Sequence, residues 1–219
     1  MKFRFAIGVL ALTILVGLAP TASAAPVLLT FEGLRDLEPV GGFYNGGTGG
    51  FGSVGPNLGV GFVGGSLAII DSDAGGSGNF GHEPSPSTVL FFLEATAVMN
   101  YAAGFDTGFS FYYSAVNRPG SINVWSGLNL TGSLLATLAL PVTPMDGGDP
   151  NGNFSPFIAI GVPFGGTAMS IDFGGTANQI AFDNVTFGSV TPGVPEPSSM
   201  VLLLSGLAGL TGYAARRRR

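Results

Sequence analysis

The sequence has no cysteine and a single histidine, His82, among its 219 residues. The absence of cysteine excludes thiol catalysis, cysteine-ligated zinc, iron–sulfur clusters and disulfide bonds. A single histidine also excludes any metal site built from several imidazoles. The remaining ligands and reactive groups are hydroxyls, carboxylates, amides and aromatic rings.

Basic side chains are also scarce outside the two ends of the chain. Between Ala25 and Val194 there are two, Arg35 and Arg118, against twelve acidic ones, which gives this segment a formal charge of −10. Binding to nucleic-acid phosphates requires clusters of Lys and Arg, so we expect no nucleic-acid partner. Such an acidic body suits a secreted protein that stays soluble or binds divalent cations.

The first segment, residues 1–24, has the organisation of a secretory signal peptide. Lys2 and Arg4 form a basic start, Phe5–Ala19 form an apolar run, and Ala22-Ser23-Ala24 is a cleavage site of small residues. We therefore expect cleavage after Ala24 and an exported mature chain.

The body, residues 25–190, is rich in glycine. The glycines alternate with short apolar, β-branched and aromatic runs, so we place the glycines in turns and the runs in strands. Many short strands with Gly-rich turns predict an all-β fold, an antiparallel, jelly-roll-like β-sandwich. The expected strands are Val27–Phe31, Leu67–Ile70, Val89–Leu93, Phe109–Tyr113, Ile122–Ser126, Leu134–Leu140, Phe157–Ile160, Met169–Phe173 and Gln179–Phe187.

Three stretches of the body carry more detailed expectations. The alternation in Phe109–Tyr113 places its apolar rings on one face of the strand. Asp183-Asn184 breaks the alternation of the last strand, which predicts a bulge or a strand buried on both sides. Glu94–Ala103 has some helical character, but we assign it to strand and loop.

The C-terminal segment, residues 191–219, has three parts in a fixed order. It begins with an extended motif, because each of its prolines fixes its own φ and disfavours helix before it. An uncharged run of 17 residues, Ser199–Ala215, follows; as a helix it would span about 26 Å. With a cleaved signal peptide and a cytoplasmic arginine cluster, this order predicts one transmembrane helix and a body outside the inner membrane. The motif is Val194-Pro195-Glu196-Pro197-Ser198, and the cluster is Arg216, Arg217, Arg218 and Arg219.

This tail resembles the PEP-CTERM sorting signal of Gram-negative bacteria, which has the same motif, apolar helix and arginine cluster. The resemblance implies processing near the Pro-Glu-Pro motif by an exosortase, a membrane protease-transpeptidase, in an organism that makes exopolysaccharide. A plain tail anchor is the alternative, but it leaves Pro195-Glu196-Pro197 without a role. The body, through FSFYYSA, INVWSGLNLTGSLLATLAL and FGGTANQIAFDNVTFGS, also looks like the Gly-rich β-sandwich often found ahead of this tail.

Three groups of oxygen-bearing side chains are candidate calcium ligands. Sandwiches of the carbohydrate-binding jelly-roll type often join an early Phe-Glu strand end to a late Asp-Asn-Val strand through one structural Ca²⁺. Glu32 and Asp183 stand at those places here, so the resemblance implies that they hold the ion. Asp71-Ser72-Asp73 and the stretch from Asp146 to Asn153 are looser alternatives. Any of these groups can also serve as a turn cap or face solvent, without a metal.

Three aromatic side chains, Trp125, Tyr112 and Tyr113, are candidates for stacking on sugar rings, and core packing is the alternative for each. Tyr112 is the best of them, because it lies opposite the apolar face of its strand. Catalysis is not expected. No pair of carboxylates is fixed by the sequence, and a Ser/His/Asp triad would have to use His82, in a Gly/Pro-rich loop without a nucleophile elbow.

These features together predict an exported surface or extracellular-matrix protein that is not an enzyme. We expect an exosortase to sort it, the inner membrane to anchor it on the periplasmic side before processing, and an exopolysaccharide or biofilm layer to receive it in a structural or adhesive role. A carbohydrate-binding module with a specific glycan is the alternative, and a secreted hydrolase is the third reading. No cofactor is expected apart from the structural calcium.

Overall fold

The computed structural model describes residues 26–94, 97–146, 152–177 and 180–193. The expected signal peptide, the motif at 194–198, the apolar run 199–215 and the arginine cluster lie outside the described residues. Within the described part of the chain, no helix is long and apolar enough to cross a membrane.

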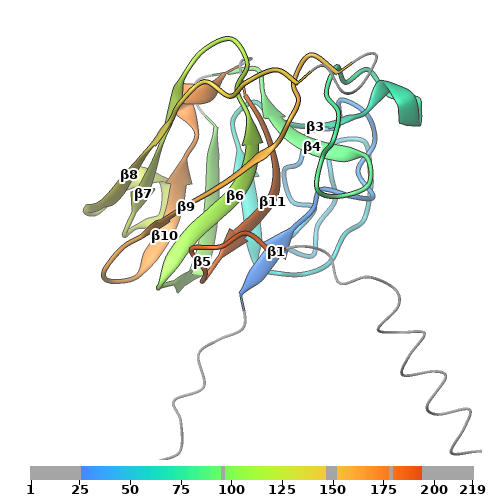
Figure 1. Cartoon of the computed structure of the whole chain (residues 1–219). Coiled ribbons are helices and arrows are strands. Elements are labelled where there is room, and N and C mark those ends of the chain that lie inside the picture. Colours follow the sequence, from blue (N-terminus) through green and yellow to red (C-terminus); the bar gives the residue numbers. More distant parts are fainter. Residues whose placement is uncertain (1–25, 95–96, 147–151, 178–179, 194–219) are drawn as a thin grey trace, which may run out of the picture.

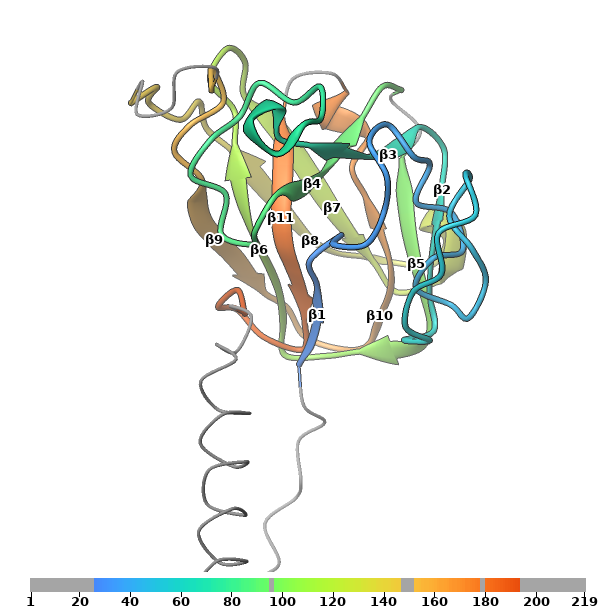
Figure 2. The ribbon, with the colours of Figure 1, turned by 90° about the vertical axis from the view of Figure 1, so that its right-hand side faces the viewer.

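Two antiparallel sheets packed face to face form the body (Figures 1 and 2). The all-β antiparallel sandwich expected from the sequence is therefore confirmed. Three short 3-10 helices lie in the connections: η1 (Ser72–Ala74), η2 (Leu128–Leu130) and η3 (Gly174–Thr176). Sheet A contains, in order, β3 (Ser66–Ile70), β4 (Thr88–Phe92), β11 (Ala181–Phe187), β6 (Gly108–Ser114) and β9 (Ile158–Pro163), with β1 (Val27–Leu29) paired to β11. Sheet B contains β2 (Val60–Val63), β5 (Val98–Phe105), β10 (Ala168–Asp172), β7 (Gly120–Trp125) and β8 (Leu134–Leu140).

Phenylalanine rings from both sheets fill the space between them. The apolar face predicted for β6 points inward, and its Phe109 and Phe111 are fully buried. Phe92 and Phe182 of sheet A meet Phe173, next to sheet B, with ring centroids 4.9 and 5.3 Å from that of Phe173. Burying a side chain of this size contributes about 2–3 kcal/mol. The core therefore accounts for the spacing of aromatic residues along the strands.

β11 lies in the middle of sheet A. All seven of its residues are buried, and it pairs with β6 along one edge and with β4 and β1 along the other. The register with β6 shifts between Asp183 and Thr186, and Asn184 takes a left-handed φ of 49°. The break in alternation thus marks a bulge, and the strand is also buried on both sides.

All nine strands expected by residue range are present, and eight of them have ends shifted by one to three residues. β8 has the bounds expected for Leu134–Leu140. β1 ends at Leu29 rather than Phe31, since Phe31 adopts φ 63°, which no strand continues. The strand expected in Glu94–Ala103 is β5. β2 was not expected, because its four residues lie within a glycine-rich segment that we assigned to turns.

Both ends of the described chain leave the sandwich on the same side, which we call the tail end. Val27 of β1 pairs directly with Phe187 of β11, so the first strand begins where the last one stops. Figures 1 and 2 show both exits at the bottom of the molecule. The β5–β6 and β9–β10 connections lie at this end, and the β4–β5 and β6–β7 connections lie at the opposite, far end.

Candidate functional sites

Glu32 and Asp183 are held by the same segment of the chain. Glu32 follows β1, and Asp183 lies at the bulge of β11, the partner of β1. The backbone N–H and hydroxyl of Ser85 donate to Asp183, at 2.7 and 2.7–2.8 Å. The N–H groups of Ser87 and Thr88 donate to Glu32 at 3.0 and 2.8 Å. Residues 85–88 therefore join the two carboxylates that the sequence proposed as a pair.

Asp183 is fully buried, which is unusual for an aspartate. Burial, aided by the charge of Glu32, outweighs the hydrogen bonds from Ser85 and from the Asn184 N–H and raises the pKa of the Asp183 carboxyl to about 7. Below about pH 7 the native fold therefore favours the protonated form of Asp183 unless a cation offsets the charge.

The neighbouring Asn184 supplies the observation that tests whether these residues fit a cation. Its side-chain Oδ1 and Nδ2 are both buried and make no hydrogen bond among the described residues. Leaving a buried polar atom unpaired costs about 1–3 kcal/mol. The described residues contain no cluster of three or more His, Asp or Glu side chains. Calcium also takes amide and backbone oxygens, so the two carboxylates and the unpaired amide oxygen of Asn184 are ligand types that this ion accepts.

The looser acidic groups have other roles in the described structure. The Asp71 carboxylate accepts from the Asp73 N–H at 3.3 Å and caps η1, as an Asx turn does. Of the Asp146–Asn153 stretch, residues 147–151 lie outside the described part. Asp146 itself accepts a hydrogen bond of 2.7 Å from the Ser155 hydroxyl.

His82 does meet a serine and an aspartate, but not in the arrangement of a hydrolytic triad. The Ser155 Oγ lies 3.2 Å from His82 Nδ1, and Asp146 Oδ2 lies 3.4 Å from the same nitrogen. In a triad the imidazole uses one nitrogen for the serine and the other for the carboxylate. Ser155 is moreover fully buried and donates to Asp146. The cluster ties the segment before β4 to the segment before β9.

Tyr112 and Trp125 lie on opposite outer faces of the sandwich. Tyr112 is half-buried on sheet A, where it pairs with Ala159 of β9. Trp125 is half-buried on sheet B, where it pairs with Ser170 and Leu134. The core separates the two rings, so they cannot stack on one sugar chain together.

A row of polar side chains runs across sheet B beside Trp125. Asn123 Nδ2 donates to Asp172 Oδ2 at 3.4 Å, and the Thr137 hydroxyl donates to Asn123 Oδ1 at 2.8 Å. These three residues come from β7, β10 and β8, and Asn123 pairs directly with each of the other two. We did not single them out from the sequence. The alternation of β7 could have identified Asn123, because this polar residue lies between the buried Ile122 and Val124 and must therefore face outward.

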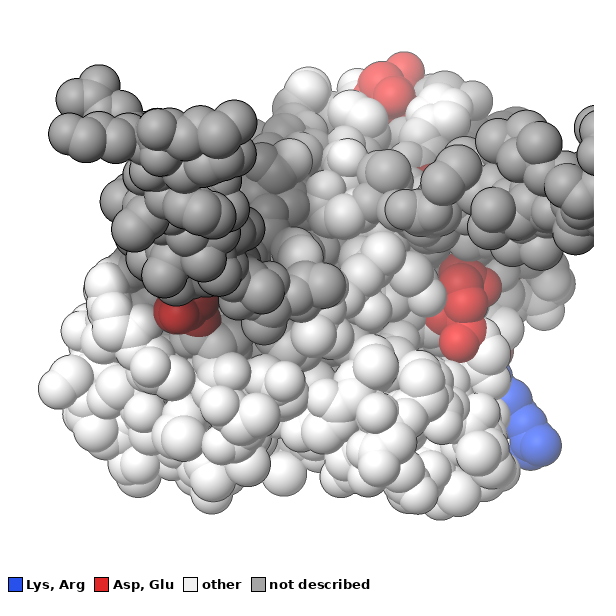
Figure 3. Space-filling model, turned by 90° about the horizontal axis from the view of Figure 1, so that it is seen from below, with Lys and Arg blue, Asp and Glu red and all other residues white. Residues whose placement is uncertain are grey.

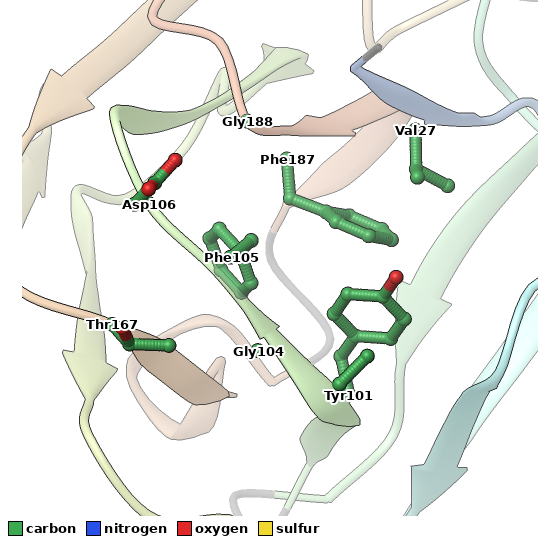
Figure 4. A pocket seen from close by; sticks show the side chains of 9 residues that line it. Val27, Tyr101, Gly104, Phe105, Asp106, Thr167, Phe187 and Gly188 are labelled. Atoms are coloured by element: carbon green, nitrogen blue, oxygen red, sulfur yellow. The ribbon is translucent and has the colours of Figure 1, made fainter. Parts of the chain in front are cut away.

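The tail end has a pocket of about 270 Å³ between the two sheets. Figure 4 shows the side chains of Tyr101, Phe187 and Val27 pointing toward one another, with Asp106 directed away from the rings. Ring centroids of Tyr101 and Phe187 lie 4.8 Å apart. The floor of the pocket is therefore aromatic, with one carboxylate at its rim.

Comparison with known proteins identifies the tail. Residues 193–219 match the family model of the PEP-CTERM protein-sorting motif, which confirms the resemblance inferred from the sequence. The motif implies processing by an exosortase and export through a membrane-anchored precursor. No curated protein matches the chain.

Two solved structures are similar to part of the body. A carbohydrate-binding module of Cellvibrio mixtus lichenase 5A, in complex with cellotriose, is 14% identical with a TM-score of 0.35, over 57% of this chain and 87% of that one. A module from Clostridium stercorarium, in complex with cellobiose, is 16% identical with a TM-score of 0.35, over 56% of this chain and 92% of that one. At these scores the likeness says nothing about a ligand of this chain.

Proposed function

We propose that this chain is an exported surface or extracellular-matrix protein whose β-sandwich has a structural or adhesive role in an exopolysaccharide layer. The observation that carries the proposal is the sorting motif at residues 193–219, joined directly to a sandwich with an open polar face. The proposal includes release from the inner membrane of a Gram-negative cell by an exosortase, and no catalytic activity.

The face of sheet B around Trp125 is the surface that we assign to polysaccharide. An indole stacks on the apolar face of a sugar ring, while amide and carboxylate groups bond its hydroxyls. Asn123, Asp172 and Thr137 place such groups on three adjacent strands next to the ring. Repeated weak contacts of this kind along a polymer give adhesion.

Binding of the exported chain to exopolysaccharide from its own organism tests this assignment. We expect co-sedimentation with the polymer, and about a tenfold loss of affinity in Trp125→Ala, because the stacked ring is lost. Tyr112→Ala is the matched control: it removes a half-buried ring from the opposite face and should bind as the parent does. Equal melting temperatures of the variants establish that both remain folded.

Three outcomes distinguish the readings. Loss of binding in Tyr112→Ala alone would place the contact on sheet A. Strong binding to one defined oligosaccharide on a glycan array would favour the alternative, a module with a specific ligand. No binding to any polymer would refute the adhesive role.

We also propose that Glu32, Asp183 and the amide oxygen of Asn184 hold one structural Ca²⁺. The burial of Asp183 and the unpaired amide of Asn184 support this proposal. The ion would neutralise the two carboxylates and join the end of β1 to β11. Its role is stability of the fold rather than chemistry.

A further inference from the structure

Residues 188–193, which we call the strap, fold back from β11 onto the outer face of sheet A. The Gly188 N–H donates to the Gly108 carbonyl at 3.0 Å, and the Ser110 hydroxyl donates to the Ser189 carbonyl at 2.9 Å. The Gly193 N–H donates to the Thr186 hydroxyl at 2.8 Å. The chain is therefore bound to the sandwich up to the residue that precedes the sorting motif's Val194.

Two glycines on neighbouring strands make room for the strap. A side chain at Gly108 of β6 or at Gly161 of β9 would collide with Val190. Gly161 pairs with Ser110, whose hydroxyl bonds the strap, so the surface that holds the strap is continuous across β6 and β9. These contacts fix the place where the tail leaves the domain.

The tether between the strap and the apolar run is short. Five residues, Val194–Ser198, separate Gly193 from Ser199. Fully extended, five residues span at most about 18 Å. In the membrane-anchored precursor that the motif implies, the exit point of the sandwich therefore stays within about 20 Å of the bilayer surface.

The tail end carries little charge. In the described β5–β6 and β9–β10 connections, Asp106 is the one charged residue. The exposed Glu94 and Asp146 belong to connections at the far end, and Asp36 lies beside the last residue of β3, Ile70. Among the atoms that Figure 3 colours, the tail end is mostly uncharged, with a few acidic side chains and one basic side chain at its edge. Turning this end toward anionic headgroups places Glu94 and Asp146 on the side away from the bilayer, whose surface field is screened over about 8–10 Å.

We propose that the tail end of the sandwich is a membrane-facing surface in the anchored precursor, held next to the lipid headgroups by the strap. The outer faces of the sheets and the far-end connections then remain free of the bilayer. The inference rests on the membrane-anchored precursor and not on the polysaccharide role, so the binding assay above and the test below fail independently.

Single spin labels measure the orientation, because the chain has no cysteine of its own. The full-length precursor is reconstituted in vesicles of phosphatidylethanolamine and phosphatidylglycerol that contain a nickel-chelating lipid. Nitroxides are attached at Thr167→Cys, in the exposed β9–β10 connection, and at Asn117→Cys, in the exposed β6–β7 connection at the far end. We expect several-fold greater relaxation enhancement by nickel at position 167 than at 117.

Two further variants test the cause of the orientation. A flexible Gly/Ser insertion of twenty residues between Gly193 and Val194 lengthens the tether to an average reach of about 28 Å and should remove most of the difference. Gly161→Ala leaves the tether length unchanged but displaces the strap, and should reduce the difference. Equal enhancement at both labels in the parent overturns the proposal, and so does a difference that persists in both variants.

Discussion

In calcium-free solution the parent chain should become less stable as the pH rises from about 4 to 7, by about 4 kcal/mol relative to the Asp183→Asn variant. The cause is the buried carboxyl of Asp183, whose pKa is about 7 in the fold and 3.8 in the unfolded chain. Between these values the native state holds more protons than the unfolded state, so a rise in pH favours unfolding. The contribution of Asp183 is thus full below pH 3.8 and is lost by about pH 7.

Calcium should reverse this dependence if Glu32, Asp183 and Asn184 hold it. The ion binds the carboxylate form, competes with protons and stabilises the fold more strongly as the pH rises. At a calcium concentration one hundred times the dissociation constant, the gain is about 2.7 kcal/mol. Urea unfolding at several pH values, in EDTA and in CaCl₂, measures both slopes.

The variants separate the two parts of this prediction. In Asp183→Asn the stability should show neither the fall with pH in EDTA nor the rise with pH in calcium. In Glu32→Gln the stabilisation by calcium should be lost. Asp73→Asn is the matched control, since it alters the looser acidic group in and next to η1 and should behave as the parent. Identical curves in EDTA and in calcium would refute the calcium site. A flat curve for the parent in EDTA would instead refute the protonation of Asp183.

The strands were predictable because the core demands a pattern that is local in the sequence. The alternation around Phe109 and Phe111 places two buried rings correctly, and the interruption at Asp183 marks the bulge. β2 was missed because its pairing with β5, rather than its composition, makes it a strand. Its four residues include one glycine and come directly after another, and local sequence rules assign such a glycine-rich stretch to a turn.

The partners of the candidate residues were less predictable, because they depend on long-range topology. Ser85 bonds Asp183 from 98 positions away, within a Gly/Pro-rich loop that carries no periodic signal. The opposite placement of Tyr112 and Trp125 depends on which strand joins which sheet. The alternation within each strand predicts that both side chains point outward. It does not predict which of the two sheets each strand belongs to.

The glycine-rich segment before β2 yields the last prediction: Glu38→Gln should destabilise the fold by about 3 kcal/mol at pH 7. Glu38 is fully buried and accepts hydrogen bonds from the N–H groups of Arg35, Phe51 and Ser53, and from the Ser53 hydroxyl. Burial acts to raise its pKa, but these donors outweigh burial and lower the pKa to about 2. The amide of a glutamine at position 38 would point its NH₂ donor at the N–H and O–H donors that bond the carboxylate of Glu38.

The acid dependence of Glu38 has the opposite sign to that of Asp183. Its folded pKa lies below the unfolded value of 4.5, so its contribution is full above pH 4.5 and is lost as the pH falls toward 2. Hydrogen exchange at residues 49–55 in Glu38→Gln should increase, because two of the donors, Phe51 and Ser53, lie there. Glu94→Gln, an exposed glutamate at the far end, should change stability by less than about 0.5 kcal/mol. A Glu38→Gln variant with the parent's unfolding midpoint would show that this glycine-rich segment is held by its apolar contacts alone, through Phe43 and Tyr44 in the core.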